Sequence, residues 1–154
     1  MSTTLITIDI ATQLKALIQS AVDASSDVDA IDPKPVISVT ALGIAEDASP
    51  DGDSVALPEI AVIVRECQPM QYRSRQRAYP VRITCATWKP SDVDQIVIYT
   101  LGHVLSAAFA EPDLTLTTGT YDALVIESAP DFEIDDRTYS MTWECQCHVL
   151  APAS

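Results

Sequence analysis

Basic residues are scarce in this sequence: nine Lys and Arg stand against 22 Asp and Glu, which gives a formal net charge of −13. Such a charge argues against nonspecific binding to nucleic acid or to anionic lipid, because the phosphate groups of both are repelled. It does not argue against a ring through which DNA passes without being held.

Histidine and glycine are also scarce, with two and four residues respectively. The few glycines form no Gly-rich phosphate loop, and neither His103 nor His148 stands in a nucleophile motif. The carboxylates fall mostly in turns, where solvation is their usual role. We therefore predict no enzyme activity, no catalytic residue, no cofactor and no metal site. A metal-dependent hydrolase that holds Mg²⁺ on acidic clusters is kept as an alternative.

Long apolar runs are absent, since none approaches the roughly 18 to 20 residues of a membrane span. Residues 1–9 contain no basic residue and no long apolar core, so we expect no secretory signal and synthesis inside the cell. A length of 154 residues with 47% apolar and 20% charged residues is typical of one globular domain, residues 1–154.

The segment 57–110 is predicted to be the unit around which the rest of the chain packs. Its first strand has two mostly apolar faces, as in a central strand covered on both sides. A polar hairpin at 68–77 leads to a second strand at 79–88. The strand faces are Ile60, Val62 and Val64 against Ala61, Ile63 and Arg65 in the first strand, and Tyr79, Val81, Ile83 and Cys85 on one side of the second.

A helix is predicted after this second strand. Ser91 is expected to open it, with Asp94 placed like the acid of a capping box. One helical face would be formed by Val93, Ile96, Val97, Leu101, Val104, Leu105 and Ala108.

The segment before this unit predicts a helix, a loop, a strand and an acidic turn. Asp9 or Thr7 can cap the helix, which runs to about Asp23. Its buried stripe would be Ile10, Leu14, Leu17, Ile18, Ala21 and Val22. A loop at 24–34, a strand at 36–44 and a turn at 46–53 follow.

The segment after residue 110 predicts three strands. Two short ones lie near 114–118 and 123–127, and an acidic turn at 130–136 leads to the last. In that last strand Tyr139, Met141, Trp143, Cys145, Cys147 and Val149 face one way, as in a half-buried antiparallel strand. The order α-β-β-β-α-β-β-β predicts an α+β fold: a single mixed, mainly antiparallel sheet with two main helices packed on it.

Two patterns imitate metal sites. Residues 47–53 resemble the start of a calcium loop, but Pro58 occupies its twelfth position, so a solvated turn is favoured. Cys145, Cys147 and His148 suggest zinc ligands, yet in a strand His148 points away from both cysteines. We expect Cys67, Cys85 and these two cysteines to be reduced, buried thiols, and the sequence leaves a disulfide open.

Five of the nine basic residues fall between Arg65 and Arg82. The protein should therefore have a positive end and broad negative surfaces, an asymmetry that suits heterologous self-association. Charge alone favours the simpler interpretation, a solvated hairpin tip.

The order of these elements resembles the tail terminator (tail completion) proteins of long-tailed bacteriophages. The resemblance covers residues 9–149. It lies in the amphipathic first helix, in Leu57-Pro58 before an alternating strand, in the hairpin with Tyr72, Arg73 and Arg77, in the helix opened by Asp92 and Asp94, and in the turn 131–136 before the last strand.

The resemblance implies a structural virion protein with an α+β fold and no enzyme activity. Such proteins form a hexameric ring on the last ring of tail-tube protein, which ends tube polymerisation and offers a surface to the head-completion proteins of the neck. Genome DNA passes through the lumen without specific binding, and no membrane is involved. The expected location is the virion, after assembly in the host cytoplasm. Another neck or head-tail adaptor, or a minor tail protein of similar fold, is the alternative.

Two groups of residues are predicted to form interfaces. Tyr72, Arg73, Arg75 and Arg77 belong to the exposed hairpin, where the arginines would meet an acidic surface on a neighbouring subunit or on the tail-tube protein. Ile98 and Tyr99 lie on a helix side that is more apolar than contact with solvent requires.

Overall fold

The computed structural model describes residues 6–31, 34–41, 58–65, 76–110, 112, 114–117, 120–127 and 130–150. Its elements, in chain order, are α1 (Ile6–Ala24), α2 (Ser26–Asp29), β1 (Val36–Ala41), β2 (Glu59–Val64), β3 (Gln76–Trp88), the 3-10 turn η1 (Lys89–Ser91), α3 (Ile96–Ala110), β4 (Thr120–Ile126), β5 (Asp131–Ile134) and β6 (Thr138–Leu150). The predicted α+β fold is confirmed.

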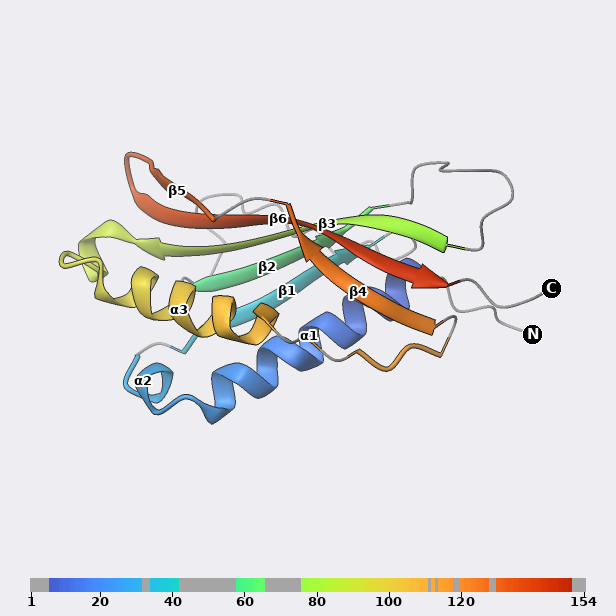
Figure 1. Ribbon diagram of the computed structural model, residues 1–154. Coiled ribbons are helices and arrows are strands. Elements are labelled where there is room, and N and C mark those ends of the chain that lie inside the picture. Colours follow the sequence, from blue (N-terminus) through green and yellow to red (C-terminus); the bar gives the residue numbers. More distant parts are fainter. Residues whose placement is uncertain are drawn as a thin grey trace.

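The strands form one mixed sheet in the order β1-β2-β3-β6-β4, and β5 also pairs with β6 (Figure 1). β1 runs parallel to β2, and the other pairings are antiparallel. β3 and β6 pair along their whole length, from Gln76 opposite Leu150 to Trp88 opposite Thr138. β4 and β5 share the other edge of β6, so this long strand lies in the interior of the sheet.

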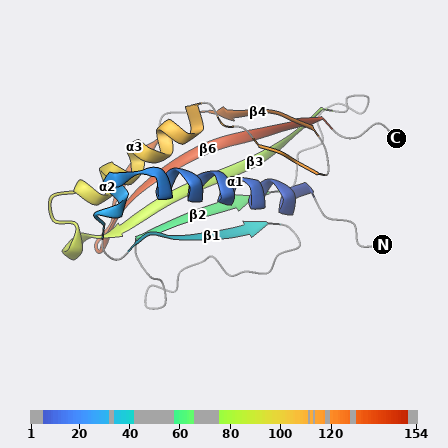
Figure 2. The ribbon, with the colours of Figure 1, turned by 90° about the horizontal axis from the view of Figure 1, so that it is seen from below.

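The helices α1 and α3 cover one face of the sheet (Figures 1 and 2). The inward side chains of β6 are the six predicted to share a face, and all of them are buried. β2 and β3 present Ile60, Val62, Val81 and Ile83 to the same layer. On the opposite face Ala61 and Ile63 are half-buried and no described helix covers them, so β2 is enclosed by helices on one side instead of two.

The structure confirms one prediction about α1 and contradicts another. Its buried stripe is confirmed at Ile10, Leu14, Ile18 and Val22, whereas Leu17 and Ala21 are only half-buried. However, Thr7 and Asp9 lie inside the helix instead of before it.

The Asp9 carboxylate connects α1 to a distant part of the chain. Its Oδ2 accepts hydrogen bonds from the Thr117 backbone N–H at 2.7 Å and from the Thr117 hydroxyl at 3.3 Å. Residues 114–117 do not form the predicted strand. The Thr117 N–H is hydrogen-bonded to a side chain of α1 and not to a neighbouring strand.

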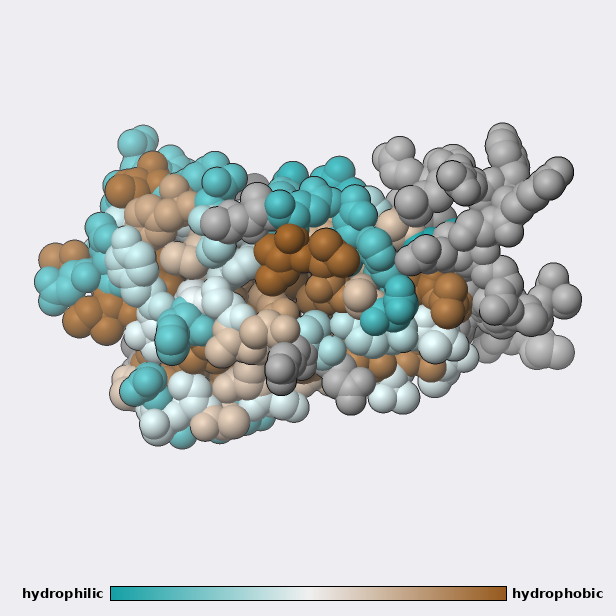
Figure 3. Space-filling view, in the orientation of Figure 1, coloured by the Kyte–Doolittle hydropathy of each residue, from teal (hydrophilic) through white to brown (hydrophobic). Residues whose placement is uncertain are grey.

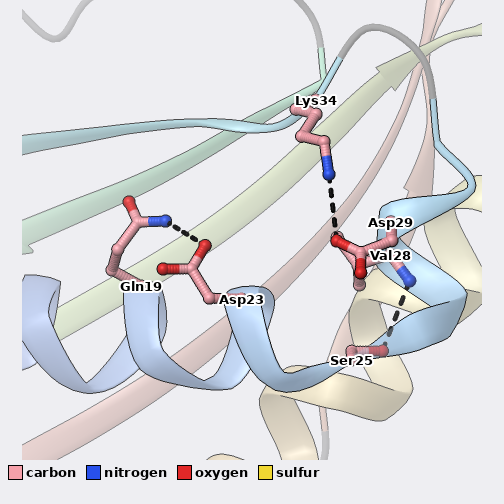
Figure 4. Close-up of polar contacts among 6 residues, drawn as sticks. All are labelled: Gln19, Asp23, Ser25, Val28, Asp29 and Lys34. Atoms are coloured by element: carbon pink, nitrogen blue, oxygen red, sulfur yellow. Dashed lines mark hydrogen bonds and ion pairs between the residues drawn. The ribbon is translucent and has the colours of Figure 1, made fainter.

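Other predicted loops contain short elements. The loop 24–34 includes α2, which Ser25 caps by accepting a hydrogen bond from the Val28 N–H (Figure 4). The turn 130–136 includes β5, which pairs with β6. The turn 46–53 with its calcium-like pattern lies outside the described residues, as does most of the hairpin 68–77.

The start of α3 also differs from the prediction. The helix begins at Ile96, and Asp92, not Ser91 with Asp94, caps it. The Asp92 carboxylate accepts the backbone N–H groups of Val97 at 2.8 Å and Ile98 at 3.0 Å, as well as the Thr87 hydroxyl at 3.0 Å. Asp92 and Thr87 are both buried, so this cap joins the helix to the end of β3 inside the protein.

The buried face of α3 is rotated from the predicted one. It consists of Ile98, Leu101, Gly102, Leu105 and Phe109. Ile96, which was predicted on the main apolar face, is instead exposed, as is Val93 before the helix. The sequence of α3 is apolar on most sides, so its hydrophobic period does not define a single stripe, and the Asp92 cap sets the rotation.

Gly102 allows α3 to approach β6 closely. A Cβ atom at this position would lie 2.5 Å from the Met141 sulfur, closer than such contacts occur. The missing side chain is therefore what brings the helix axis near the sheet at this point.

Replacing Asp92 with Ala should lower the free energy of unfolding by about 2 kcal/mol, because three donors, two of them buried, lose their acceptor. Urea unfolding monitored by circular dichroism measures the change. The matched control is Asp94→Ala in the same connection, where the exposed side chain predicts a change within about 0.5 kcal/mol. Equal losses in both variants would contradict the cap.

Candidate functional site

The structure separates the two predicted interface groups. Tyr72, Arg73 and Arg75 lie outside the described residues. Arg77 belongs to β3, opposite Val149, and is half-buried instead of standing at a hairpin tip. Tyr99 lies on α3, which follows the other end of β3.

Ile98 is a core residue and not a surface residue. Its side chain is fully buried, because the rotation of α3 points it at the sheet. Its predicted role in an interface is therefore wrong. Tyr99, the next residue, is 53% exposed and keeps that role as a candidate.

Tyr99 is part of an aromatic stack that joins α3 to the sheet. Its ring lies parallel to that of Phe132 in β5, with centroids 5.5 Å apart, and Phe132 stacks in turn on Tyr139 of β6 at 6.1 Å. The Lys89 ammonium lies 5.7 Å from the centre of the Tyr139 ring. The stack fixes the short strand β5 next to the start of α3. Without the stack, only the hydrogen bonds to β6 would hold this strand.

Large apolar side chains are exposed around this stack. Val93 is 75% exposed, Ile96 65% and Ile134 60%. With Tyr99 they form what we call the apolar patch. Brown side chains appear at the corresponding end of Figure 3, interspersed with teal ones, and a larger brown group lies in the middle of the view. Among the described residues, Val36, Val125, Ile126 and Leu150 are also exposed and lie outside the patch. Exposed apolar side chains that lie close together are typical of a surface that contacts another molecule.

A hollow of about 380 Å³ lies beside the apolar patch, between α2 and the first half of α3. Its walls combine acidic, polar and apolar side chains: Asp27, Asp94, Gln95, Ile96, Tyr99, Thr100, His103 and Val104. Gln95 has a φ of 59°, an uncommon conformation for a residue with a side chain. This left-handed residue turns the chain between the Asp92 cap and α3 and so shapes one wall of the hollow.

Exposed polar contacts lie in and next to α2 (Figure 4). Lys34 pairs with Asp29 of α2 at 2.9 Å, and within the preceding helix α1 Gln19 donates a hydrogen bond to Asp23 at 2.9 Å. Among the described residues, by contrast, neither Asp27 nor Asp94 pairs with a basic side chain. Within the described part of the chain, the hollow therefore has two carboxylates without an ion-pair partner.

The described basic residues of the 65–82 cluster lie away from this hollow. Arg65 follows β2 and its N–H binds the carbonyl of Pro80, while Arg77 lies near the start of β3. Arg82 pairs with Glu144 at 2.7 Å across the sheet. The end of the molecule that carries Arg65 and Arg77 is called the basic end below, and the end with the hollow and the apolar patch is called the acidic end, although Lys34, Lys89 and Arg137 also lie there.

The patterns that imitate metal sites do not assemble in the described residues. No group of three or more His, Cys, Asp or Glu side chains there is arranged to hold a metal ion. His148 lies on the face of β6 opposite Cys145 and Cys147, as predicted, and its Nε2 is 3.4 Å from the Gln146 side-chain oxygen. His103 is exposed on α3. No helix in the described ranges has both the length and the apolar character of a membrane span.

The cysteines Cys85, Cys145 and Cys147 are free and buried, which confirms the prediction for these three. Burial raises the pKa of each thiol from about 9.0 to about 12, and the carboxylates of Glu144 and Glu127 add to the effect at Cys145. Thiols with such pKa values carry almost no thiolate near neutral pH and are poor nucleophiles and metal ligands. Cys67 lies outside the described residues, and its state stays a prediction.

Comparison with models of known protein families found no match, and comparison with curated proteins found no similar sequence.

Sequence reasoning identified Tyr99 but missed the rest of the acidic end. Val93 and Ile96 were placed in the core because their spacing fits a helical stripe. Phe132 was read as part of a turn, although it alternates with Ile134 in a short period-two pattern that is the signal of a strand.

Replacing Phe132 with Ala should lower the free energy of unfolding by about 2 kcal/mol and loosen β5, because the ring joins Tyr99 to Tyr139. Chemical unfolding measures the first effect, and amide hydrogen exchange in β5 the second. The neighbouring exposed Glu133→Ala is the control and should change neither. Unchanged exchange in the Phe132 variant would show that the stack does not hold β5.

In the folded protein the three buried thiols should react with iodoacetamide far more slowly than a free thiol at about pH 8, because their pKa values of about 12 leave little thiolate. Mass spectrometry of alkylated peptides follows each site. After denaturation all four cysteines should react, and a thiol that stays unreactive would indicate a disulfide or a bound metal.

Alkaline pH should also destabilise the fold. Above pH 9 the thiols ionise in the unfolded chain but stay protonated in the folded one, so the folded state is the one that holds more protons. The free energy of unfolding should therefore fall as the pH rises from about 9 to about 12, and urea titrations across this range measure it. A variant with Cys85→Ala should show a smaller pH-dependent fall than the parent protein.

Proposed function

We propose that this protein is a structural component of the virion that forms a ring at the head-proximal end of a long bacteriophage tail. There it would end the polymerisation of the tail tube and provide the surface on which the head is joined. The observation that carries the proposal is an α+β domain with exposed apolar side chains, Val93, Ile96, Tyr99 and Ile134, at one end. Such a surface suits contact with another molecule, and contacts between unlike surfaces of neighbouring copies give rings when they close.

The fold and the charge support the same proposal. The resemblance to tail terminators implies an α+β sheet with helices, and this protein has such a sheet with two main helices on one face. The net charge of −13 suits the wall of a channel for DNA, since it repels the phosphate backbone and does not trap it.

A different neck or head-tail adaptor position is the second candidate, because the same two-ended arrangement suits any ring of the head-tail joint. The position in the particle distinguishes the two. A tail terminator contacts the last ring of tail-tube protein, whereas an adaptor contacts the head side.

Cryo-electron microscopy of the phage particle tests the proposal. We expect a ring of six copies around the tail axis, directly above the last ring of tail-tube protein. Loss of the protein should give tails of uncontrolled length without heads, because nothing ends tube polymerisation. A single copy per particle, a position away from the tail axis, or tails of normal length without the protein would each overturn it.

A further inference from the structure

We propose that the open edge of β4 pairs with the same strand of a second copy of this chain, antiparallel and centred on Val125, to give a two-fold symmetric dimer. The contact extends the sheet from one copy into the other. This proposal goes beyond the proposed function and does not rest on it, because a surface that contacts itself joins copies in twos and does not close a ring.

β4 is the last strand on its side of the sheet, and β6 is its partner among the described strands. The Glu127 N–H binds the Glu144 carbonyl at 2.9 Å, which fixes the phase of this antiparallel ladder. Hydrogen-bonded and non-hydrogen-bonded pairs alternate along such a ladder, so Val125 bonds to β6. The backbone N–H and C=O groups of Leu124 and Ile126 therefore point to the other edge, where no described strand receives them.

This edge is apolar as well as unpaired. Val125 is 41% exposed and Ile126 37%, and the stretch from Ala123 to Ile126 contains neither a charged residue nor a proline. Native proteins commonly place such residues on edge strands, where they prevent pairing with other chains. The larger brown group in the middle of Figure 3 lies where Figure 1 draws the second half of β4. The edge is therefore accessible to a further strand.

An irregularity limits how much of β4 can pair. Its register against β6 shifts between Tyr121 and Ala123, so the ladder is regular only from Ala123 onward. A bulge bends the strand that contains it and interrupts its pairing. The segment available to a second strand is therefore 123–127.

This segment is complementary to itself in one register. With Leu124 opposite Ile126 of the second copy, and Ile126 opposite its Leu124, all the outward backbone groups of 123–127 are hydrogen-bonded. Val125 then lies opposite Val125 in a non-hydrogen-bonded pair, the kind in which side chains approach most closely. Glu127 lies opposite Ala123, so like charges do not meet directly. A shift by two residues pairs Leu124 or Ile126 with itself and leaves the other residue without a partner in the segment.

The side chains on both faces of the sheet identify a second copy as the occupant. Val125 lies opposite Gln146, on the face without described helices, and there the two copies of Val125 cover each other. Ile126 lies opposite the buried Cys145, on the helix face, and there it lies beside Leu124 of the other copy. One symmetric contact therefore removes exposed surface from both Val125 and Ile126, which stabilises the dimer.

Charged residues in place of Val125 test the proposal, because a two-fold contact brings this residue next to itself. Val125→Glu places two carboxylates together, and Val125→Lys places two ammonium groups together. Each variant alone should self-associate at least about tenfold more weakly than the parent protein in sedimentation velocity at low salt. The control Val93→Glu makes the same change at an exposed residue of the apolar patch and should leave self-association unchanged.

A one-to-one mixture of Val125→Glu and Val125→Lys is the decisive measurement. Opposite charges meet in the mixed dimer, so association should recover, and native mass spectrometry should show the mixed dimer in excess over both dimers of a single variant. Such recovery is specific to a contact in which position 125 meets itself. A contact between two different surfaces of the chain does not produce it.

Amide hydrogen exchange tests the backbone part of the contact in the parent protein. In dilute protein the N–H groups of Leu124 and Ile126 should exchange faster than that of Val125, which is bonded to β6. At high concentration both should become protected, because they are then bonded to the second copy. Protection that is the same at every concentration would show that the chain covers this edge itself, and would reject the proposal.

Three further results would overturn it: a parent protein that stays monomeric at about 1 mM, charged variants that are folded by circular dichroism and associate like the parent, or a mixture whose association does not recover. A control that loses association as strongly as the Val125 variants would assign the contact to the apolar patch instead.

Discussion

The carboxylate of Asp92 is the interaction on which the arrangement of the candidate site depends. It is buried, and it accepts hydrogen bonds from the N–H groups of the second and third residues of α3 and from the hydroxyl of Thr87 near the end of β3. A buried carboxylate that has three donors is stabilised in one position, and the helix that it caps can then take only one rotation. Gly102 against Met141 then sets how close that helix lies to the sheet.

The rotation of α3 decides which of its many apolar residues are buried. Ile98, Leu101, Leu105 and Phe109 enter the core, and Ile96 and Tyr99 are left outside. Exposing large apolar side chains costs free energy in water, and most folded proteins scatter such residues singly. Here Val93, Ile96, Tyr99 and Ile134 lie at one end, on elements joined by the Tyr99–Phe132 stack, so a rigid surface presents them together.

The sheet gives the protein two unlike ends. β3 and β6 pair over 13 residues each, and this long ladder separates the Arg77 end from the end where α2, α3 and β5 meet. Charge does not follow this division, because Lys89 and Arg137 lie at the same end as Asp27 and Asp94. A domain with two unlike ends can associate head to tail through unlike surfaces, which is the physical basis for the ring proposed here.

The sequence by itself determined the features that depend on a local period. The alternation in β6 and β3 predicted the buried apolar residues of their shared inner face, but not the buried Thr87 of β3. The stripe of α1 predicted four of its buried residues. Both follow because side chains two residues apart in a strand, or one turn apart in a helix, point to the same face. The α+β class and the mixed sheet followed from the order of these patterns.

Only the tertiary structure decided the rotation of α3, the role of Asp9 and the strand β5. α3 is apolar on most sides, so its rotation depends on a carboxylate four residues earlier and on a hydroxyl in another element. Asp9 binds Thr117, 108 residues away, and β5 has few residues of its own and depends on Phe132 between two rings. These contacts join distant segments and produce no periodic pattern in the sequence. The acidic end of the molecule could therefore be recognised only in the folded structure.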